Sequence, residues 1–86
     1  MNEELMAYLY RWANNSTSFL IVELNLIELT PDGGEIRNEE VLAPESAVTR
    51  LFDLDLFGWQ VKSYTWLNMA SDFTKLKVEV YRREIK

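Results

Sequence analysis

The sequence of 86 residues predicts an α+β protein, a two-layer sandwich in which two helices cover an antiparallel sheet of about four strands. Two segments carry apolar residues at helical spacing, and four others alternate apolar and polar residues as half-buried strands do. Proline, glycine and asparagine separate these segments where turns are expected. The resulting order is α-β-β-α-β-β, and the length indicates a single domain over residues 1–86.

Residues 3–14 are expected to form the first helix. Four apolar side chains recur on one face at positions i, i+3, i+4 and i+7: Leu5, Tyr8, Leu9 and Trp12. Two glutamates in the first turn favour this start, because carboxylates suit the positive end of the helix dipole. Met6, Tyr10 and Ala13 widen the apolar face, so we expect the helix to be covered on more than one side.

Residues 18–29 are expected to form a long strand. One face of it alternates in apolar residues, namely Leu20, Val22, Leu24 and Leu26. Pro31 fixes φ, and Gly33 and Gly34 allow positive φ, so a hairpin turn follows. It leads into a weaker strand over residues 35–42, whose charged residues indicate an exposed sheet edge. Dimerisation is also suggested, either edge-to-edge through the long first strand or mediated by a helix.

The second helix is expected to begin at Pro44, because proline is tolerated at the first helical position. It is expected to end before Gly58, a suitable C-terminal cap. We expect Leu56 and Phe57 to pack against its last turn. One predicted face holds Val48, Leu51, Phe52 and Asp55, with Ala47 and Leu54 beside it.

Residues 59–67 and 73–83 are expected to form the last hairpin, joined by a polar loop over residues 68–72. Strict alternation predicts an inward set of Trp59, Val61, Leu67, Leu76, Val78 and Val80. The same alternation turns another set outward: Lys62, Tyr64, Trp66, Lys75, Lys77 and Tyr81.

The composition makes most enzyme classes improbable. The chain has no cysteine and no histidine, so thiol nucleophiles, the usual zinc sites and the usual neutral-pH base are missing. Asp53 and Asp55 are the nearest approach to a paired-carboxylate motif, but residues two apart on a helix point in different directions. We therefore predict a protein without catalytic activity, cofactor or metal.

No segment resembles a secretory signal or a membrane span. The first residues are acidic, and the most apolar stretch, residues 19–29, is too short and contains Glu23, Asn25 and Glu28. A cytoplasmic protein without membrane contact is the expectation.

Charge is divided unevenly along the chain. Residues 1–58 hold 11 acidic and 3 basic side chains, whereas residues 59–86 hold 3 acidic and 6 basic ones. The acidic side chains concentrate at Asp32, Glu35, Glu39, Glu40 and Glu45. Three interpretations of this set stay open: a solvated edge that deters strand pairing, a docking surface for a basic partner, and a cation site without calcium-loop spacing.

The last hairpin has three interpretations of its own. Lysines interleaved with aromatic rings on a sheet face would suit single-stranded nucleic acid, because rings stack on bases and ammonium groups neutralise phosphates. Alternatively, Tyr64 and Trp66 pack beneath the first helix, whose apolar surface needs a cover, or they anchor a protein partner.

The stretch from Ala47 to Arg83 resembles a small bacterial and phage α+β domain family of unknown function, in which a helix ends in Gly-Trp before two strands. The matching residues here are Leu51, Gly58, Trp59, Val61, Tyr81, Arg82 and Arg83. Gln60 stands where the family has an acidic residue. The resemblance implies the fold and no particular chemistry.

The leading hypothesis is a small non-catalytic interaction module that covers a surface of a larger, basic partner. Phage-type inhibitors of nucleic-acid-binding proteins have this profile. Its predicted contact residues are Asp32, Glu35, Glu39, Glu40, Glu45, Tyr64 and Trp66. The alternatives are a single-stranded nucleic-acid binder that uses the C-terminal hairpin, and a homodimeric structural subunit.

Overall fold

Six helices and strands follow one another in the computed structural model, which describes residues 2–15 and 19–83. They are α1 (Glu3–Asn15), β1 (Phe19–Leu29), β2 (Glu35–Leu42), α2 (Pro44–Leu56), β3 (Gln60–Ala70) and β4 (Phe73–Arg83). The predicted order α-β-β-α-β-β and the α+β class are confirmed.

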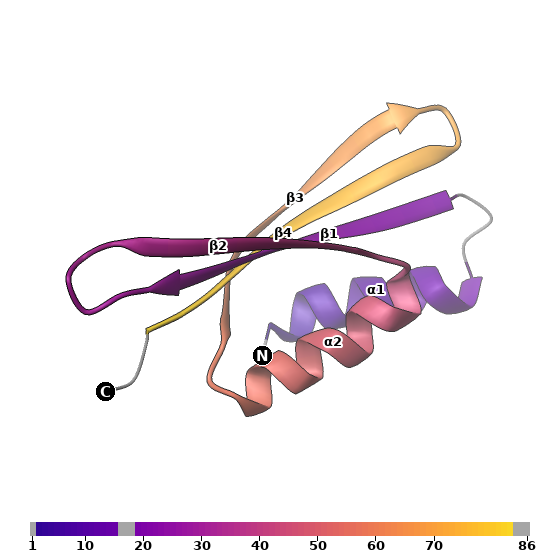
Figure 1. The fold of residues 1–86 in the computed structure, drawn as a ribbon. Coiled ribbons are helices and arrows are strands. Elements are labelled where there is room, and N and C mark those ends of the chain that lie inside the picture. The colour runs from indigo at the N-terminus through magenta and orange to yellow at the C-terminus, as the bar shows by residue number, and fades with distance from the viewer. Residues whose placement is uncertain (1, 16–18, 84–86) are drawn as a thin grey trace.

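The strands form one sheet in the order β2-β1-β4-β3, and both helices lie on the same side of it (Figure 1). β1 pairs antiparallel with β2 and β4 pairs antiparallel with β3, but β1 and β4 run parallel at the centre. The sheet is therefore mixed, and the prediction of a purely antiparallel sheet was wrong. Alternation along a strand fixes which side chains face the core, but not the direction of the neighbouring strand.

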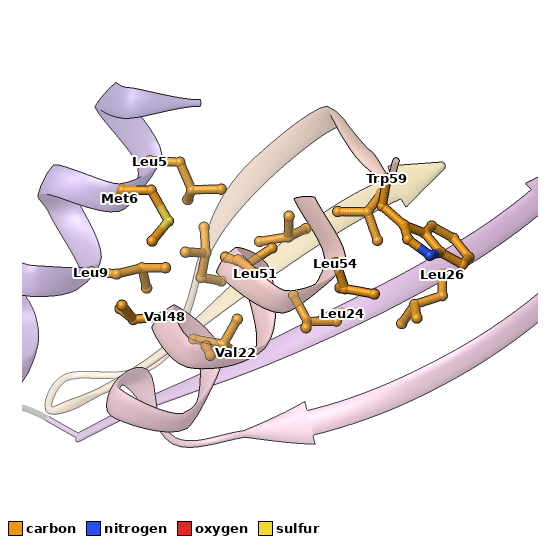
Figure 2. Close-up of a cluster of buried hydrophobic side chains, with 14 of the residues drawn as sticks. Leu5, Met6, Leu9, Val22, Leu24, Leu26, Val48, Leu51, Leu54 and Trp59 are labelled. Atoms are coloured by element: carbon orange, nitrogen blue, oxygen red, sulfur yellow. The ribbon is translucent and has the colours of Figure 1, made fainter. Parts of the chain in front are cut away.

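The core lies between the helices and the two central strands (Figure 2). β1 and β4 supply the buried strand side chains of this core, because the two strands lie at the centre of the sheet and the helices cover one face of it. Fully buried side chains include Leu5, Leu9, Val22, Leu24, Leu51, Leu76, Val78 and Val80. The inward sets predicted for residues 18–29 and for β4 are thus confirmed.

α2 begins at Pro44 and is closed by the predicted glycine cap. Gly58 has φ of +88°, its N–H donates to the Asp55 carbonyl, and the Trp59 N–H donates to the Leu54 carbonyl. This turn brings Trp59 back to the core with 9% of its surface exposed.

The prediction for the faces of α2 was partly wrong. Its buried residues are Ala47, Val48, Leu51 and Leu54. Phe52 is 45% exposed, and Leu56 and Phe57, which we expected to pack against the last turn, are 80% and 71% exposed. Positions 52 and 56 lie one turn apart on the side of the helix away from the sheet, so they cannot reach the core.

β3 departs from the predicted alternation after Val61. Val61 lies opposite Val80 and Tyr64 lies opposite Val78, so a register shift between Val61 and Ser63 inserts one residue. A bulge of this kind reverses the facing of every later residue. Leu67, predicted inward, consequently lies opposite Lys75 on the open side of the sheet. β3 also continues to Ala70, so the predicted loop over 68–72 is a short turn at residues 71–72.

β1 is a central strand with partners along both edges, so the proposed edge-to-edge dimerisation through this strand is excluded. The free edges of the sheet belong to β2 and β3. β2 is the exposed edge strand that the sequence predicted. Neither α1 nor α2 is long and apolar enough to cross a membrane.

Candidate functional site

The five acidic residues predicted as a docking set do not form one patch. Asp32 lies in the β1–β2 turn and Glu45 in the first turn of α2, with the eight residues of β2 between them, a span of about 26 Å. Glu39 and Glu40 are neighbours on one strand and therefore point to opposite sides of the sheet.

Three of these carboxylates are held by other groups of the chain. Glu40 accepts two hydrogen bonds of 2.9 Å from the Arg50 guanidinium, which lowers the pKa of Glu40. Glu35 lies 2.9 Å from Arg37 Nε. Asp32 accepts hydrogen bonds from the Thr30 hydroxyl and the Gly34 N–H. Both lower the pKa of Asp32, and the Thr30 hydroxyl has the larger effect. These contacts give the three residues structural roles in β2 and its flanking elements.

Tyr64 and Trp66 pack beneath α1, as the second interpretation of the hairpin predicted. The Trp66 ring stacks on Trp12 at a centroid distance of 5.8 Å and meets Tyr8 edge-to-face at 5.8 Å. Burial raises the pKa of Tyr64, and the neighbouring Glu4 raises it further. The aromatic rings therefore serve the contact between α1 and β3.

The interleaved face proposed for nucleic acid does not exist as predicted. Tyr64 and Trp66 share the helix side with Val78 and Leu76. The predicted residues of β4, namely Lys75, Lys77 and Tyr81, belong to the open side, and Lys62 is the extra residue of the bulge, without a register partner on β4. The β-bulge after Val61 is the cause, because it separates Tyr64 and Trp66 from the lysines of β4.

Several polar groups of the last hairpin are also engaged within the chain. Lys75 Nζ lies 2.7 Å from Glu23 Oε1, and Arg82 Nε lies 2.6 Å from Glu28 Oε2. The Arg82 guanidinium also sits 4.8 Å from the centroid of the Trp59 ring. These contacts reduce the positive charge that the hairpin offers to a ligand.

Glu23 should make the stability of the protein depend on acidic pH. Its hydrogen bonds with Lys75 and then Asn25 hold its pKa below the ordinary value of 4.5. A carboxyl whose pKa is lower in the folded state stabilises the fold above its unfolded pKa, and that contribution is lost as pH falls through the folded pKa. We expect Glu23→Gln to flatten the fall in the free energy of unfolding below about pH 4.5, measured by urea denaturation.

Lys75→Met provides the complementary test of this ion pair. It leaves the Glu23 carboxyl, which is 8% exposed, without its main partner, so the loss of stability should be larger at pH 7 than at pH 4. An unchanged pH profile in both variants would show that the pair does not contribute to folding.

Large apolar side chains gather instead on the outer surface of the helical layer. We define the outer helical patch as Ala7, Tyr10 and Phe52, which line one cleft, together with the exposed Leu56 one turn further along α2 and the exposed Phe57 directly after its end. Tyr10 is 48% exposed and Phe52 45%, and both line an open cleft of about 450 Å³ between the helices. Sequence reasoning missed this patch because it assigned Phe52 to the core.

The helical layer also carries the excess negative charge. α1 and α2 together hold five acidic and two basic side chains, whereas the four strands hold six of each. Glu3 lines the cleft of the outer helical patch, and Asp53 follows Phe52 in the sequence. Arg50, one of the two cations, is already paired with Glu40. The patch therefore combines exposed apolar rings with an acidic surround.

Within residues 2–15 and 19–83, no three acidic side chains gather closely enough to hold a metal ion. Asp53 and Asp55 are exposed on α2.

Comparisons of the sequence with models of protein families and with curated proteins, and of the structure with solved structures, find no match. The resemblance of residues 47–83 to a bacterial and phage domain family stays a prediction.

Proposed function

We propose that this protein is a small non-catalytic binding module that covers a surface of a larger, basic protein through the outer helical patch. The observation that carries the proposal is the exposure of Tyr10, Phe52, Leu56 and Phe57 on the acidic helical layer.

Apolar side chains clustered on the surface of a small protein typically mark an interaction site. Aromatic residues supply much of the binding energy in protein interfaces because they bury a large area at low entropic cost. Here Tyr10 and Phe52 lie on facing helices around one cleft, so a single protruding side chain of a partner can contact both. This arrangement supports Tyr10 and Phe52 as anchors, in place of Tyr64 and Trp66.

The charge around the patch favours a basic partner. The formal charge of the chain is −5, and its excess negative charge lies on the same layer as the exposed rings. Complementary potentials accelerate association and make it sensitive to salt. We propose that the partner is a nucleic-acid-binding protein whose phosphate-binding surface the module occupies, so that the module acts as an inhibitor in the manner of phage-type inhibitors.

Binding of single-stranded nucleic acid by the C-terminal hairpin is the less favoured function. It required Tyr64 and Trp66 on the same sheet face as the lysines, and these two rings lie on the other face. Lys75 is in addition paired with Glu23.

Affinity capture from the native host, followed by binding kinetics with the captured protein, tests the proposal. We expect Leu56→Arg, which places a cation among the acidic residues around the patch, to weaken the complex at least 30-fold, because central interface residues contribute about 2 kcal/mol or more. The matched control is Val41→Arg, since Val41 is 58% exposed on β2. Equal affinity of both variants for the partner would contradict the proposal.

A further inference from the structure

The two free edges of the sheet differ in composition. β2 carries four charged residues among eight, namely Glu35, Arg37, Glu39 and Glu40. β3 carries one among eleven, Lys62. Charged residues on an edge strand deter the addition of another strand, and an uncharged edge invites it. β2 is therefore protected in the way that natural sheet edges usually are, and β3 is not.

The middle of β3 is regular and suited to pairing. Residues 63–68 lie between two register shifts and contain no charge, no glycine and no proline. Their inner edge pairs with β4, and no strand in the described part of the chain occupies the outer edge. The backbone groups that point outward from this segment are consequently available to a further strand.

Apolar side chains are exposed to solvent at the same edge, both on the sheet and beside α1 in the helical layer. Trp66 is 36% exposed, Leu67 38% and Met69 59%. Beneath them, Trp66 and α1 border an open pocket of about 450 Å³ whose other lining residues are Tyr8, Arg11, Trp12 and Asn15. Within the described residues, Trp12 Nε1 is buried without a hydrogen-bond partner. The sheet and the helical layer both end here without a cover.

We infer that β3 pairs antiparallel with β3 of a second copy of this chain, so that the two sheets join into one across a two-fold axis. Such an interface places the same residues on both sides, so it must be self-complementary in charge. Residues 63–68 satisfy this requirement in any register, because no like charges come opposite each other. The acidic outer helical patch does not satisfy it, which leaves that surface for a basic partner.

Facing residues of an antiparallel pair project to the same side of a sheet. The bulge after Val61 puts Tyr64 and Trp66 on the helix side. Trp66 of one copy would thus meet Tyr64 or Trp66 of the other, and the two α1 pockets would be enclosed together. Pairing of the two β3 strands would therefore add contacts between aromatic rings to the backbone hydrogen bonds.

The size of this edge suits a dimer that dissociates on dilution. A strand of eleven residues is about 36 Å long, and the edge of the sheet is about 10 Å deep. The helical layer adds about another 10 Å of depth along part of that length. The edge thus offers on the order of 600 Å² per copy, at the lower limit of specific protein interfaces.

Sedimentation velocity across protein concentrations from micromolar to several hundred micromolar tests the inference. We expect the mass to rise from 10.1 kDa, the mass of one chain, to about twice that value. The variant Leu67→Glu/Met69→Glu should stay monomeric throughout. The control Ile36→Glu/Val41→Glu, which places two carboxylates on β2, should dimerise as the wild type does.

Circular dichroism and the urea midpoint establish that both variants are folded. A wild type that stays monomeric at every concentration would overturn the inference, even if another protein's strand were found at this edge. Dimerisation lost in the β2 control and kept in the β3 variant would also overturn it. The inference is independent of the proposed function, since the β3 variant should retain the partner that Leu56→Arg loses.

Discussion

Replacing Leu51 with alanine should lower the free energy of unfolding by about 3 kcal/mol, within the range of 2 to 5 kcal/mol typical of buried leucines. Leu51 is fully buried and lies at the centre of the cluster in Figure 2. The substitution removes its apolar contacts and leaves a cavity that close-packed neighbours fill only in part. Urea denaturation followed by circular dichroism measures the change, and the m-value should stay constant.

Phe52→Ala is the matched control for Leu51→Ala. Phe52 is the next residue of α2, but it lies on the outer surface and is 45% exposed. Its replacement should change the free energy of unfolding by no more than about 1 kcal/mol, because it leaves no closed cavity. If Phe52→Ala destabilised the protein more than Leu51→Ala does, α2 would present the opposite face to the sheet.

Trp66→Ala should lower the free energy of unfolding by about 2 kcal/mol, less than a fully buried tryptophan would because Trp66 is 36% exposed. It removes the stacked contact with Trp12, whose ring plane is inclined by 26°, and the edge contact with Tyr8. The near-ultraviolet circular dichroism from the coupled indole rings should weaken in parallel. Both measurements belong at a protein concentration low enough to keep the chain monomeric.

Leu67→Ala isolates the structural role of Trp66. Leu67 has a similar exposure of 38% but faces the open side of the sheet opposite Lys75. We expect this control substitution to lower the free energy of unfolding by less than about 1 kcal/mol. Wild-type stability in Trp66→Ala, together with quenching of tryptophan fluorescence by oligonucleotides at low salt, would instead support the nucleic-acid alternative.

Helix boundaries and edge strands were predictable because local chemistry determines them. Pro44 suits a helix start and no other helical position, and Gly58 supplies the positive φ that ends α2. The charged residues of β2 marked it as an edge. The parallel pairing of β1 with β4 depends on segments about 50 residues apart, and no local pattern encodes it.

The faces of β3 could not be predicted from alternation, because the bulge after Val61 leaves no mark in residue types. A packing argument succeeded where alternation failed: the apolar surface of α1 needed a cover, and Trp66 supplies it. The sequence did contain a signal for the outer helical patch. α2 has more apolar positions than one sheet-facing side can bury, which leaves Phe52 and Leu56 outside.

The dispersal of the predicted acidic residues has a different cause. Counting carboxylates along the chain ignores partners that the fold brings from elsewhere, such as Arg50 for Glu40 and Lys75 for Glu23. The excess negative charge of the helices and strands lies on the helical layer, beside the exposed rings.

Hydroxyl-radical footprinting of the protein, free and bound to its captured partner, tests the role of the outer helical patch most directly. Binding should reduce the oxidation rates of Tyr10, Phe52, Leu56 and Phe57 at least threefold, because all four become covered. Phe19, which is 61% exposed on β1, should keep its rate. Unchanged rates at the four patch residues, with protection at Phe19 or on β2, would show that the partner binds elsewhere.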